Sequence, residues 1–317
     1  MKKNTLLLLL LFLNYEVFCQ TNFHRDTTVN VSENGITFKN AWASGLNSTQ
    51  FNEIDLDLDG KKDLIVFDKS GNKILPYLNK NGQFVFAPDF RQSFPYLHDW
   101  VILADYNCDG KNDIYTYSTG GVAIYENTSS SNLSFSLVTN LVLSDYGGPN
   151  PINIYISAVD IPAVSDVDYD GDLDILTFKI TGGFIEFHKN MAMETIGNCD
   201  TVLFELSESC WGNFYEGLNN YTLNCQNCQC PPIINHPNAK QKHAGSTLLA
   251  IDIDNDYDKD IVLGDISFSN LNLLINGGDS TSANMILVDS MFPQNNSNTI
   301  PASMDIFPAA YYLDLTD

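Results

Sequence analysis

Residues 55–68 read DLDLDGKKDLIVFD, and three further stretches repeat the same pattern. They are DYNCDGKNDIYTYS at 105–118, DVDYDGDLDILTFK at 166–179 and DIDNDYDKDIVLGD at 252–265. Each stretch places Asp, or in one case Asn, at positions 1, 3, 5 and 9 of a short loop. Carboxylates with this spacing surround a hard cation, and a backbone carbonyl at position 7 adds to the oxygen shell. The repeat therefore predicts four structural Ca²⁺ loops.

The predicted ligands are the side chains at positions 1, 3, 5 and 9 and the backbone carbonyl at position 7 of every loop. In loops 1 to 4 respectively they are Asp55, Asp57, Asp59, Lys61 and Asp63; Asp105, Asn107, Asp109, Lys111 and Asp113; Asp166, Asp168, Asp170, Asp172 and Asp174; Asp252, Asp254, Asp256, Asp258 and Asp260. One such stretch alone is equally typical of a solvated turn, because Asp, Asn and Gly are common turn residues. Four copies in one register favour metal binding over that alternative.

Position 6 of the loop favours a backbone conformation with positive φ, which Gly adopts at little cost. Loops 1 to 3 have Gly60, Gly110 and Gly171 at this position, whereas loop 4 has Tyr257. A bulky side chain is strained at positive φ. We therefore expect the fourth site to be strained, rearranged or weaker in its affinity for Ca²⁺.

The loops do not fit an EF-hand, which requires Glu at position 12 and a following helix. The residues at position 12 are instead Val66, Thr116, Thr177 and Leu263. The sequence after each loop is rich in β-branched and aromatic side chains, which predicts strands at 64–67, 114–117, 175–178 and 261–263. Each loop therefore leads into a strand, which also disfavours the helix-following dockerin loop.

A second predicted strand follows each loop and ends in Asn, at offsets of 24, 22, 24 and 24 residues from the first Asp. We interpret these residues, Asn79, Asn127, Asn190 and Asn276, as hairpin-turn residues. The loops recur at intervals of 50, 61 and 86 residues. Short strands repeated with a period of about 40–60 residues are typical of β-propeller blades. The long third interval predicts an insertion on a blade loop, or a degenerate extra blade, between Met191 and His243.

The four stretches resemble the repeats of FG-GAP/VCBS proteins, which form integrin-α-like β-propellers with calcium loops. The resemblance spans roughly residues 40–317, and the VCBS variant is the better match because no Phe-Gly or Gly-Ala-Pro signature is present. It implies an all-β propeller domain over residues 20–317, with about seven blades when complete and about four to five in this chain. The N-terminal leader and the overall character of the sequence are similar to those of secreted Bacteroidetes proteins of the type IX system.

The N-terminus predicts a signal peptide over residues 1–19. Lys2 and Lys3 precede an apolar run at 6–13, which is too short to span a bilayer. The alternative is a lipoprotein leader with a lipidated Cys19, which the bulky Phe18 disfavours. No other segment has a transmembrane run, so we expect a secreted protein or one attached to the outer cell surface.

The C-terminal residues FPAAYYLDLTD repeat the apolar approach to a loop and stop at Asp317. We therefore expect a fifth repeat to be interrupted at 314–317. The chain is interpreted as a fragment that lacks further blades and any C-terminal sorting or attachment domain.

The composition is strongly acidic, with 39 Asp and Glu residues against 16 Lys and Arg and a net charge of −23. The loops hold much of this charge, and four bound Ca²⁺ ions would bring it to about −15. Nucleic-acid binding requires clustered Lys and Arg. The composition therefore argues against a nucleic-acid partner, and no basic helix indicates a membrane surface.

Six cysteines remain after the predicted leader. Five lie in the insertion and one lies inside loop 2: Cys199, Cys210, Cys225, Cys228, Cys230 and Cys108. In an exported protein such a cluster predicts disulfides, although the connectivity cannot be derived from spacing. A zinc site at Cys225, Cys228 and Cys230 is the alternative, but the spacing lacks a usual second pair. The aromatic residues of the insertion either form a small core or contact a partner: Trp211, Phe214, Tyr215 and Tyr221.

The sequence predicts no catalytic residues. It shows no His-Glu-x-x-His, no nucleophile elbow and no Gly-rich phosphate loop, and we interpret His98 and His188 as structural. Two functions follow. The first is a non-catalytic, Ca²⁺-stabilised propeller that binds a protein or glycan partner in adhesion. The second is an accessory propeller module of a secreted hydrolase or lyase whose catalytic domain lies outside this chain.

Overall fold

The computed structural model describes residues 26, 28–43, 45–218, 220–230, 246–294, 296, 298–305 and 307–315. The chain divides into two units, Met1–Trp42 and Ala43–Asp317. The described part of the first unit contains a hairpin of β1 (Ser32–Glu33) and β2 (Ile36–Thr37). The predicted signal peptide, with Cys19, lies outside the described residues.

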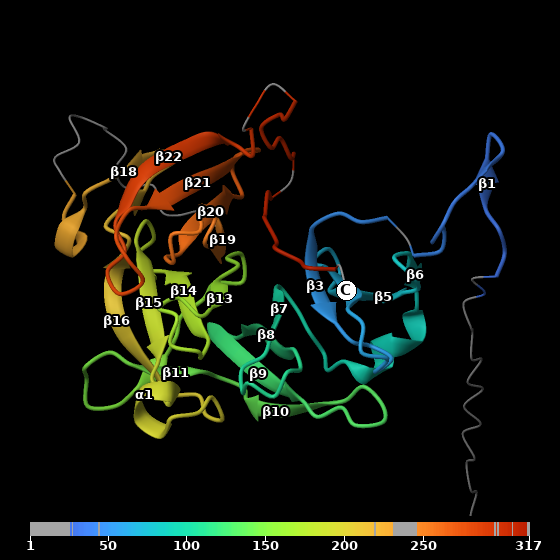
Figure 1. The fold of residues 1–317 in the computed structure, drawn as a ribbon, viewed down its shortest axis with the longest axis horizontal. Helices are drawn as coiled ribbons and strands as arrows, with labels where there is room; N and C mark the ends of the chain where they lie inside the picture. Colours follow the sequence, from blue (N-terminus) through green and yellow to red (C-terminus); the bar gives the residue numbers. More distant parts are fainter. Residues whose placement is uncertain are drawn as a thin grey trace, which may run out of the picture. The chain divides into compact units, whose positions relative to one another are not determined.

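The described part of the second unit contains four larger sheets in chain order, one for each Asp loop, and each is built on four antiparallel strands (Figure 1). Blade 1 consists of β3 (Thr49–Ile54), β4 (Asp63–Asp68), β5 (Lys73–Asn79) and β6 (Phe84–Phe86). Blade 2 consists of β7 (Val101–Ala104), β8 (Asp113–Ser118), β9 (Gly121–Asn127) and β10 (Phe135–Thr139). Blade 3 contains β13 (Ala163–Ser165), β14 (Asp174–Phe178), β15 (Ile185–Asn190) and β16 (Phe204–Trp211). Blade 4 consists of β19 (Ser246–Ile251), β20 (Asp260–Asp265), β21 (Leu271–Asn276) and β22 (Met285–Phe292).

This arrangement is a β-propeller with four blades, and it confirms the predicted all-β fold. In every blade the Asp loop connects the first strand to the second, and the strands predicted after the loops are found as β4, β8, β14 and β20. All residues of β14 and β20 are buried, because neighbouring sheets cover both faces of these strands. Burial on both faces explains why their sequences are continuous apolar runs rather than alternating ones.

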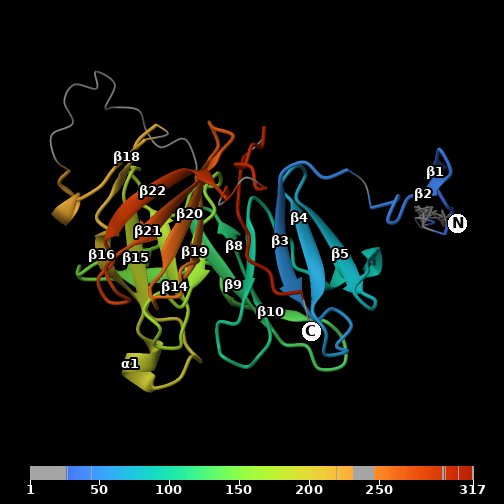
Figure 2. The same ribbon diagram turned by 45° about the horizontal axis from the view of Figure 1, so that its top comes forward.

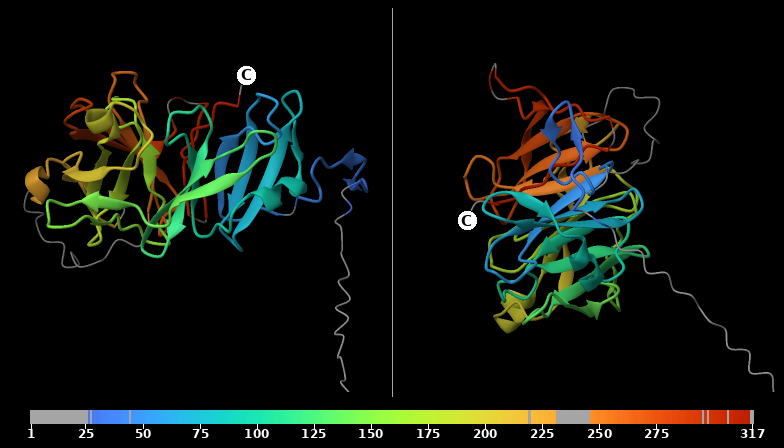
Figure 3. Two further views of the ribbon diagram at one scale, coloured as in Figure 1. Left: turned by 90° about the horizontal axis from the view of Figure 1, so that it is seen from below. Right: turned by 90° about the vertical axis from the view of Figure 1, so that its right-hand side faces the viewer.

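The hydrophobic core lies between adjacent sheets. Figure 3 shows these sheets from two further directions. Ile65 and Phe67 of blade 1 pack with Ile114 of blade 2. Separate clusters join blade 2 to blade 3 and blade 3 to blade 4. Burying each large apolar side chain contributes about 1.5–3 kcal/mol, so contacts between blades provide much of the stability of the unit.

Side-chain amides also join the first strands of blades 1 and 2. The Val101 N–H donates to Gln50 Oε1 at 2.7 Å, and the Leu103 N–H donates to Asn52 Oδ1 at 2.8 Å. These bonds occupy backbone groups on the inner edge of β7 that its own sheet does not use. The two amides therefore fix the position of strand β7 along strand β3.

Blade 3 is larger than the other blades. Its sheet continues beyond β16 into β11 (Leu143–Asp145), which pairs with β16 in parallel, and β12 (Ile152–Asn153). After Met191 come the short helix α1 (Ala192–Ile196), β16, a hairpin of β17 (Tyr215–Glu216) and β18 (Tyr221–Thr222), and η2 (Gln226–Cys228). The other short helix, η1 (Pro88–Ser93), follows blade 1. The extra residues of the third interval therefore include an outer strand of blade 3.

Residues 301–305 and 307–315 lie outside the helices and strands and return from blade 4 to blade 1 (Figure 2). Ala302, Met304 and Ala310 pack against the apolar cluster of blade 4. The Tyr311 ring then contacts Phe51 of β3 in an edge-on arrangement, with 5.9 Å between ring centroids. The predicted fifth repeat at 314–317 is described only to residue 315, so its loop lies mostly outside the described residues.

Three disulfides confirm the prediction made from the cysteines. They join Cys108 to Cys199, Cys210 to Cys228 and Cys225 to Cys230. The three residues of the alternative zinc site are therefore all engaged in disulfides. Two bridges are local to the segment after β15, whereas the first joins loop 2 to the segment that follows α1.

Candidate metal centres

The carboxylate at position 1 shapes each loop. In loop 1, Asp55 Oδ1 accepts a hydrogen bond from the Asp59 N–H at 3.0 Å, and Oδ2 accepts one from the Gly60 N–H at 2.8 Å. Asp105, Asp166 and Asp252 accept the same pair of bonds in the other loops at 2.7–3.2 Å. The four loops therefore share one backbone conformation.

That conformation includes two residues with positive φ. Position 4 has φ between 58° and 63° in all four loops, at Leu58, Cys108, Tyr169 and Asn255. Position 6 has φ of 84° at Gly60, and Tyr257 keeps the same region at 69°. Loop 4 is thus strained rather than rearranged, because its position 1 carboxylate still accepts both backbone hydrogen bonds.

The carboxylate at position 9 is buried and held at both oxygens. Asp63 is 1 % exposed; its Oδ2 accepts from the Leu56 N–H at 2.8 Å, and its Oδ1 accepts from the Asn79 N–H at 2.6 Å. Asp113, Asp174 and Asp260 repeat both bonds, with Asn127, Asn190 and Asn276 as the second donors. The third strand of each blade, which ends in this Asn, therefore positions the last predicted ligand of the loop.

Sequence reasoning missed this role of the four asparagines. Asn79 Oδ1 does accept the Gly82 N–H at 2.8 Å, as expected of a turn residue, but its own N–H fixes Asp63. The nearly constant spacing contained the signal for this role. Asn79, Asn190 and Asn276 each follow their position 9 Asp by 16 residues, and Asn127 follows Asp113 by 14.

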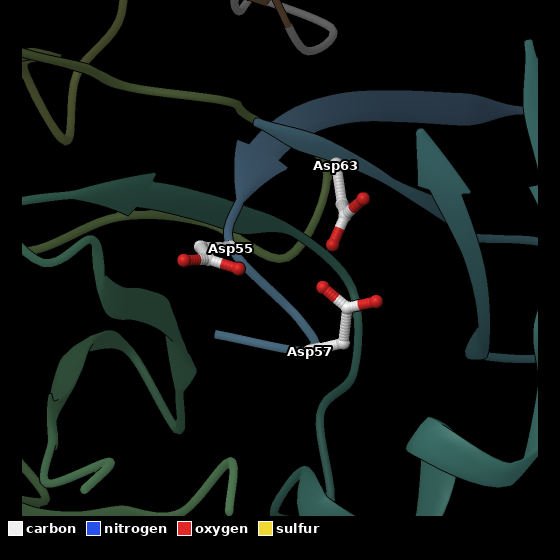
Figure 4. A group of neighbouring side chains, drawn as sticks. All are labelled: Asp55, Asp57 and Asp63. Atoms are coloured by element: carbon white, nitrogen blue, oxygen red, sulfur yellow. The ribbon is translucent and has the colours of Figure 1, made fainter. Parts of the chain in front are cut away.

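The carboxylates at positions 1, 3 and 9 converge in three loops. Asp55, Asp57 and Asp63 each offer an oxygen within 4.8 Å of the others, and loops 3 and 4 repeat this group. Figure 4 shows the Asp57 and Asp63 carboxylates facing one another, with one oxygen of Asp55 turned toward them. Like charges held this close repel one another, so a divalent cation among them would stabilise the arrangement.

Loop 2 has the same conformation but fewer charges, because Asn107 stands at position 3.

The structure does not bring the position 5 carboxylate into the three-residue groups of positions 1, 3 and 9. Instead, Asp59 Oδ1 accepts the Lys61 N–H at 3.0 Å, and the equivalent bond recurs in every loop. Position 5 thus also orients position 7, whose carbonyl is a predicted ligand.

Several buried carboxylate oxygens in the loops have no hydrogen-bond partner among the described residues. They include Oδ1 of Asp57 and of Asp168, which are the equivalent position 3 residues of loops 1 and 3. Lysines contact only the other oxygen, Oδ2, of each of these two carboxylates. A buried polar oxygen without a partner is costly. Oxygen donors of this kind fit a hard cation such as Ca²⁺, so the residues present match the predicted ion.

Burial raises the pKa of the position 9 carboxyls despite the two backbone hydrogen bonds that oppose the shift. The pKa of Asp113 is raised to about 6 and that of Asp174 to about 8. The nearby Asp side chains of the same loops add to the effect. A cation bound beside these groups would favour their charged form.

Lysines neutralise part of the loop charge. Lys80 Nζ lies 2.7 Å from Asp57 Oδ2 in loop 1. In loop 3, Lys189 pairs with Asp168, with Asp170 and with Glu194 of α1. The group of Asp168, Asp170 and Glu194 thus already holds a cationic side chain of the protein itself.

His188 lies in a buried polar group with Ser144 and Glu186. Its Nδ1 is 2.9 Å from Ser144 Oγ, and its Nε2 is 3.6 Å from Glu186 Oε2. Ser144 and His188 are both 0 % exposed. A substrate cannot reach a hydroxyl buried in this way, so the group joins β11 to β15 rather than forming a nucleophile.

His98 pairs with its neighbour on the chain. Its Nδ1 lies 2.6 Å from Asp99 Oδ2, and its ring contacts Tyr117 edge-on. These contacts agree with the structural role expected for this histidine.

The central cavity of the propeller has a volume of 360 Å³. The first strands of all four blades line it, together with residues 309–313 of the C-terminal segment.

Two aromatic residues of the insertion are unsuited to partner contact, because Trp211 and Phe214 are buried in the core between blades 3 and 4.

Comparison with known proteins supports the repeat. Residues 55–116, which span loops 1 and 2, match the family model described as an FG-GAP-like repeat. No curated protein matches the sequence. A solved structure of an Agrocybe aegerita lectin, described as recognising non-reducing terminal N-acetylglucosamine, has a TM-score of 0.38 and 16 % identity, covering 77 % of this chain and 67 % of the lectin chain.

The FG-GAP-like match agrees with the propeller seen here. No helix in the described part of the chain is long and apolar enough to cross a membrane.

Proposed function

We propose that this protein is an extracellular, non-catalytic β-propeller in which the blades are stabilised by Ca²⁺ bound in the Asp loops and which binds a protein or glycan partner. The observation that carries the calcium assignment is the convergence of carboxylates at positions 1, 3 and 9, with buried oxygens that have no other described partner. Residues at positions 1, 3, 5 and 9 and the position 7 carbonyls would hold the ion.

Ca²⁺ would link the strands of each blade. Position 9 lies at the start of the second strand, position 1 follows the first strand, and the Asn that ends the third strand holds position 9. An ion bound to positions 1 and 9 therefore connects three strands at one end of the sheet. Three disulfides support an oxidising, extracellular environment, where Ca²⁺ sites of about 10⁻⁴–10⁻³ M affinity are filled. Export through a type IX system and attachment to the cell surface remain predictions.

Thermal unfolding in Ca²⁺ and in EGTA tests the calcium assignment. With ~2 mM free Ca²⁺ and a Kd of ~10⁻⁴ M, each filled site adds about 2 kcal/mol to the free energy of unfolding. We expect a markedly higher Tm in Ca²⁺ than in EGTA with Mg²⁺ present. Identical melting curves under the two conditions would overturn the proposal.

A loop variant localises the effect. Asp57→Asn removes the position 3 charge of loop 1 and gives this loop the residue that loop 2 carries as Asn107. It is therefore expected to reduce the Ca²⁺-dependent rise in Tm and to lower the affinity of loop 1 for Ca²⁺ without emptying the site. Asp89→Asn, which removes a charge in η1 outside the loops, is the matched control and should leave both quantities unchanged. Equal behaviour of the two variants would exclude loop 1 as a site.

A further inference from the structure

In loops 2 and 3 the side chain at position 4 contacts the next Asp loop. The residue at this position has a positive φ in all four loops. Cys108 of loop 2 places its Sγ 3.4 Å from the Gly171 carbonyl oxygen of loop 3. Tyr169 of loop 3 in turn reaches loop 4.

Tyr169 contacts loop 4 at three places. Its hydroxyl lies 3.3 Å from Asp252 Oδ2 and donates to this carboxylate, which stands at position 1. Its ring meets the Tyr257 ring edge-on with 6.5 Å between centroids. Lys259 Nζ lies 4.1 Å from the centroid of the Tyr169 ring, a cation–π contact.

These contacts connect ligands of two neighbouring sites. Tyr169 stands between Asp168 and Asp170, so ordering loop 3 around an ion fixes its backbone. Its hydroxyl bonds the same oxygen of Asp252 that accepts the Tyr257 N–H at 3.1 Å. The position of loop 3 thereby influences the orientation of the first carboxylate of loop 4.

We propose that Tyr169 couples the two sites, so that Ca²⁺ bound in loop 3 raises the affinity of loop 4 for Ca²⁺. This inference rests on the proposed calcium function of the loops. Coupling between two sites is reciprocal, so filling loop 4 raises the affinity of loop 3 by the same factor. Tyr169 is a positioning residue here, because it orients Asp252 without donating a ligand itself.

The test follows loop 4 directly by NMR of the full chain labelled with ¹⁵N-tyrosine. The Tyr257 amide belongs to loop 4 and is assigned by its loss in Tyr257→Phe. Ca²⁺ is titrated into the wild type and into Tyr169→Phe, which keeps the ring and removes the hydroxyl. We expect the midpoint of the Tyr257 shift to move to about threefold to tenfold higher Ca²⁺ in the variant. Tyr96→Phe, an exposed tyrosine outside the loops, is the control and should leave the midpoint unchanged.

A second variant separates coupling from local damage. Asp166→Asn removes the charge and one oxygen of the position 1 ligand of loop 3. It is expected to weaken Ca²⁺ binding in loop 3, and therefore also in loop 4, when Tyr169 is present. In the Tyr169→Phe background it should have little further effect on loop 4, because the connection is already lost. Calorimetric titration gives the number of ions bound by each variant.

The outcomes are distinguishable. If Tyr257 responds to Ca²⁺ with the same midpoint in the wild type and in Tyr169→Phe, the coupling is wrong while the calcium function stands. If Asp166→Asn weakens loop 4 equally in both backgrounds, Tyr169 does not carry the coupling. If the wild type shows neither a shift nor binding heat, the calcium function and the coupling both fail.

Discussion

Tyr257 adopts at position 6 the left-handed backbone conformation that glycine adopts in the other three loops. A non-glycine residue in this region costs about 1–2 kcal/mol. The tyrosine ring is 77 % exposed, and its one described ring contact is with Tyr169. The side chain that strains loop 4 therefore also contributes to the contact between loops 3 and 4.

Replacing Tyr257 tests the strain directly. We expect Tyr257→Gly to be more stable than Tyr257→Ala by about 1 kcal/mol, because both variants lose the ring but only glycine relaxes the backbone. Chemical unfolding of the two variants in excess Ca²⁺ gives the difference. An alanine variant as stable as the glycine variant would show that position 6 is not strained.

Among the three disulfides, the Cys108–Cys199 bridge has the widest span, with a sequence separation of 91 residues. It ties loop 2 to the segment after α1, and both of its sulfur atoms lie 3.4 Å from the Gly171 carbonyl oxygen of loop 3. Three segments from two blades thus meet at this bridge. The bridge restricts the unfolded chain strongly, because it closes a long loop.

Removing this bridge should destabilise the propeller more than removing a local one. We expect Cys108→Ser with Cys199→Ser to lose about 2–4 kcal/mol of unfolding free energy. The control is Cys225→Ser with Cys230→Ser, whose bridge spans only 5 residues. Urea unfolding of both double variants under non-reducing conditions compares them, and a smaller loss for the first pair than for the control would contradict the expectation.

Sequence periodicity predicts elements well where one pattern repeats. Each Asp loop is followed by a strand because its carboxylates and the buried run are adjacent in the chain, so local spacing contains the information. The β11 addition to blade 3 was not predictable, since Ser144 pairs with Phe204 and no loop marks either strand. The disulfide partners and the contact of Tyr169 with Asp252 likewise depend on how blades pack, which spacing within one blade does not encode.

For the whole molecule, the raised pKa values of the loop carboxyls predict an acid-stabilised calcium-free state. Burial raises the pKa of Asp113 and Asp172 to about 6 and that of Asp174 to about 8, from 3.8. Between 3.8 and these values the folded state binds more protons than the unfolded state. Stability in chelator therefore falls as pH rises through this window.

We expect the Tm in EGTA to be higher at pH 5.5 than at pH 8, and the rise in Tm caused by Ca²⁺ to be larger at pH 8. The reason is that Ca²⁺ competes with protons for the same carboxylates. Melting curves at both pH values, with Ca²⁺ and with EGTA, check the two statements. A calcium effect that is independent of pH would contradict them.

The bridge between Cys108 and Cys199 also determines how the propeller responds to tension. A force applied to the chain ends passes across the bridge and leaves the 91-residue interval between its cysteines unstretched. At roughly 3.3–3.6 Å per residue, about 300 Å of contour length stays hidden until the bridge is reduced. Most of blade 2 and the strands β13, β14 and β15 of blade 3 lie within that interval. Under tension, the middle of this propeller would keep a fixed extension while the chain outside the bridge unfolds and lengthens.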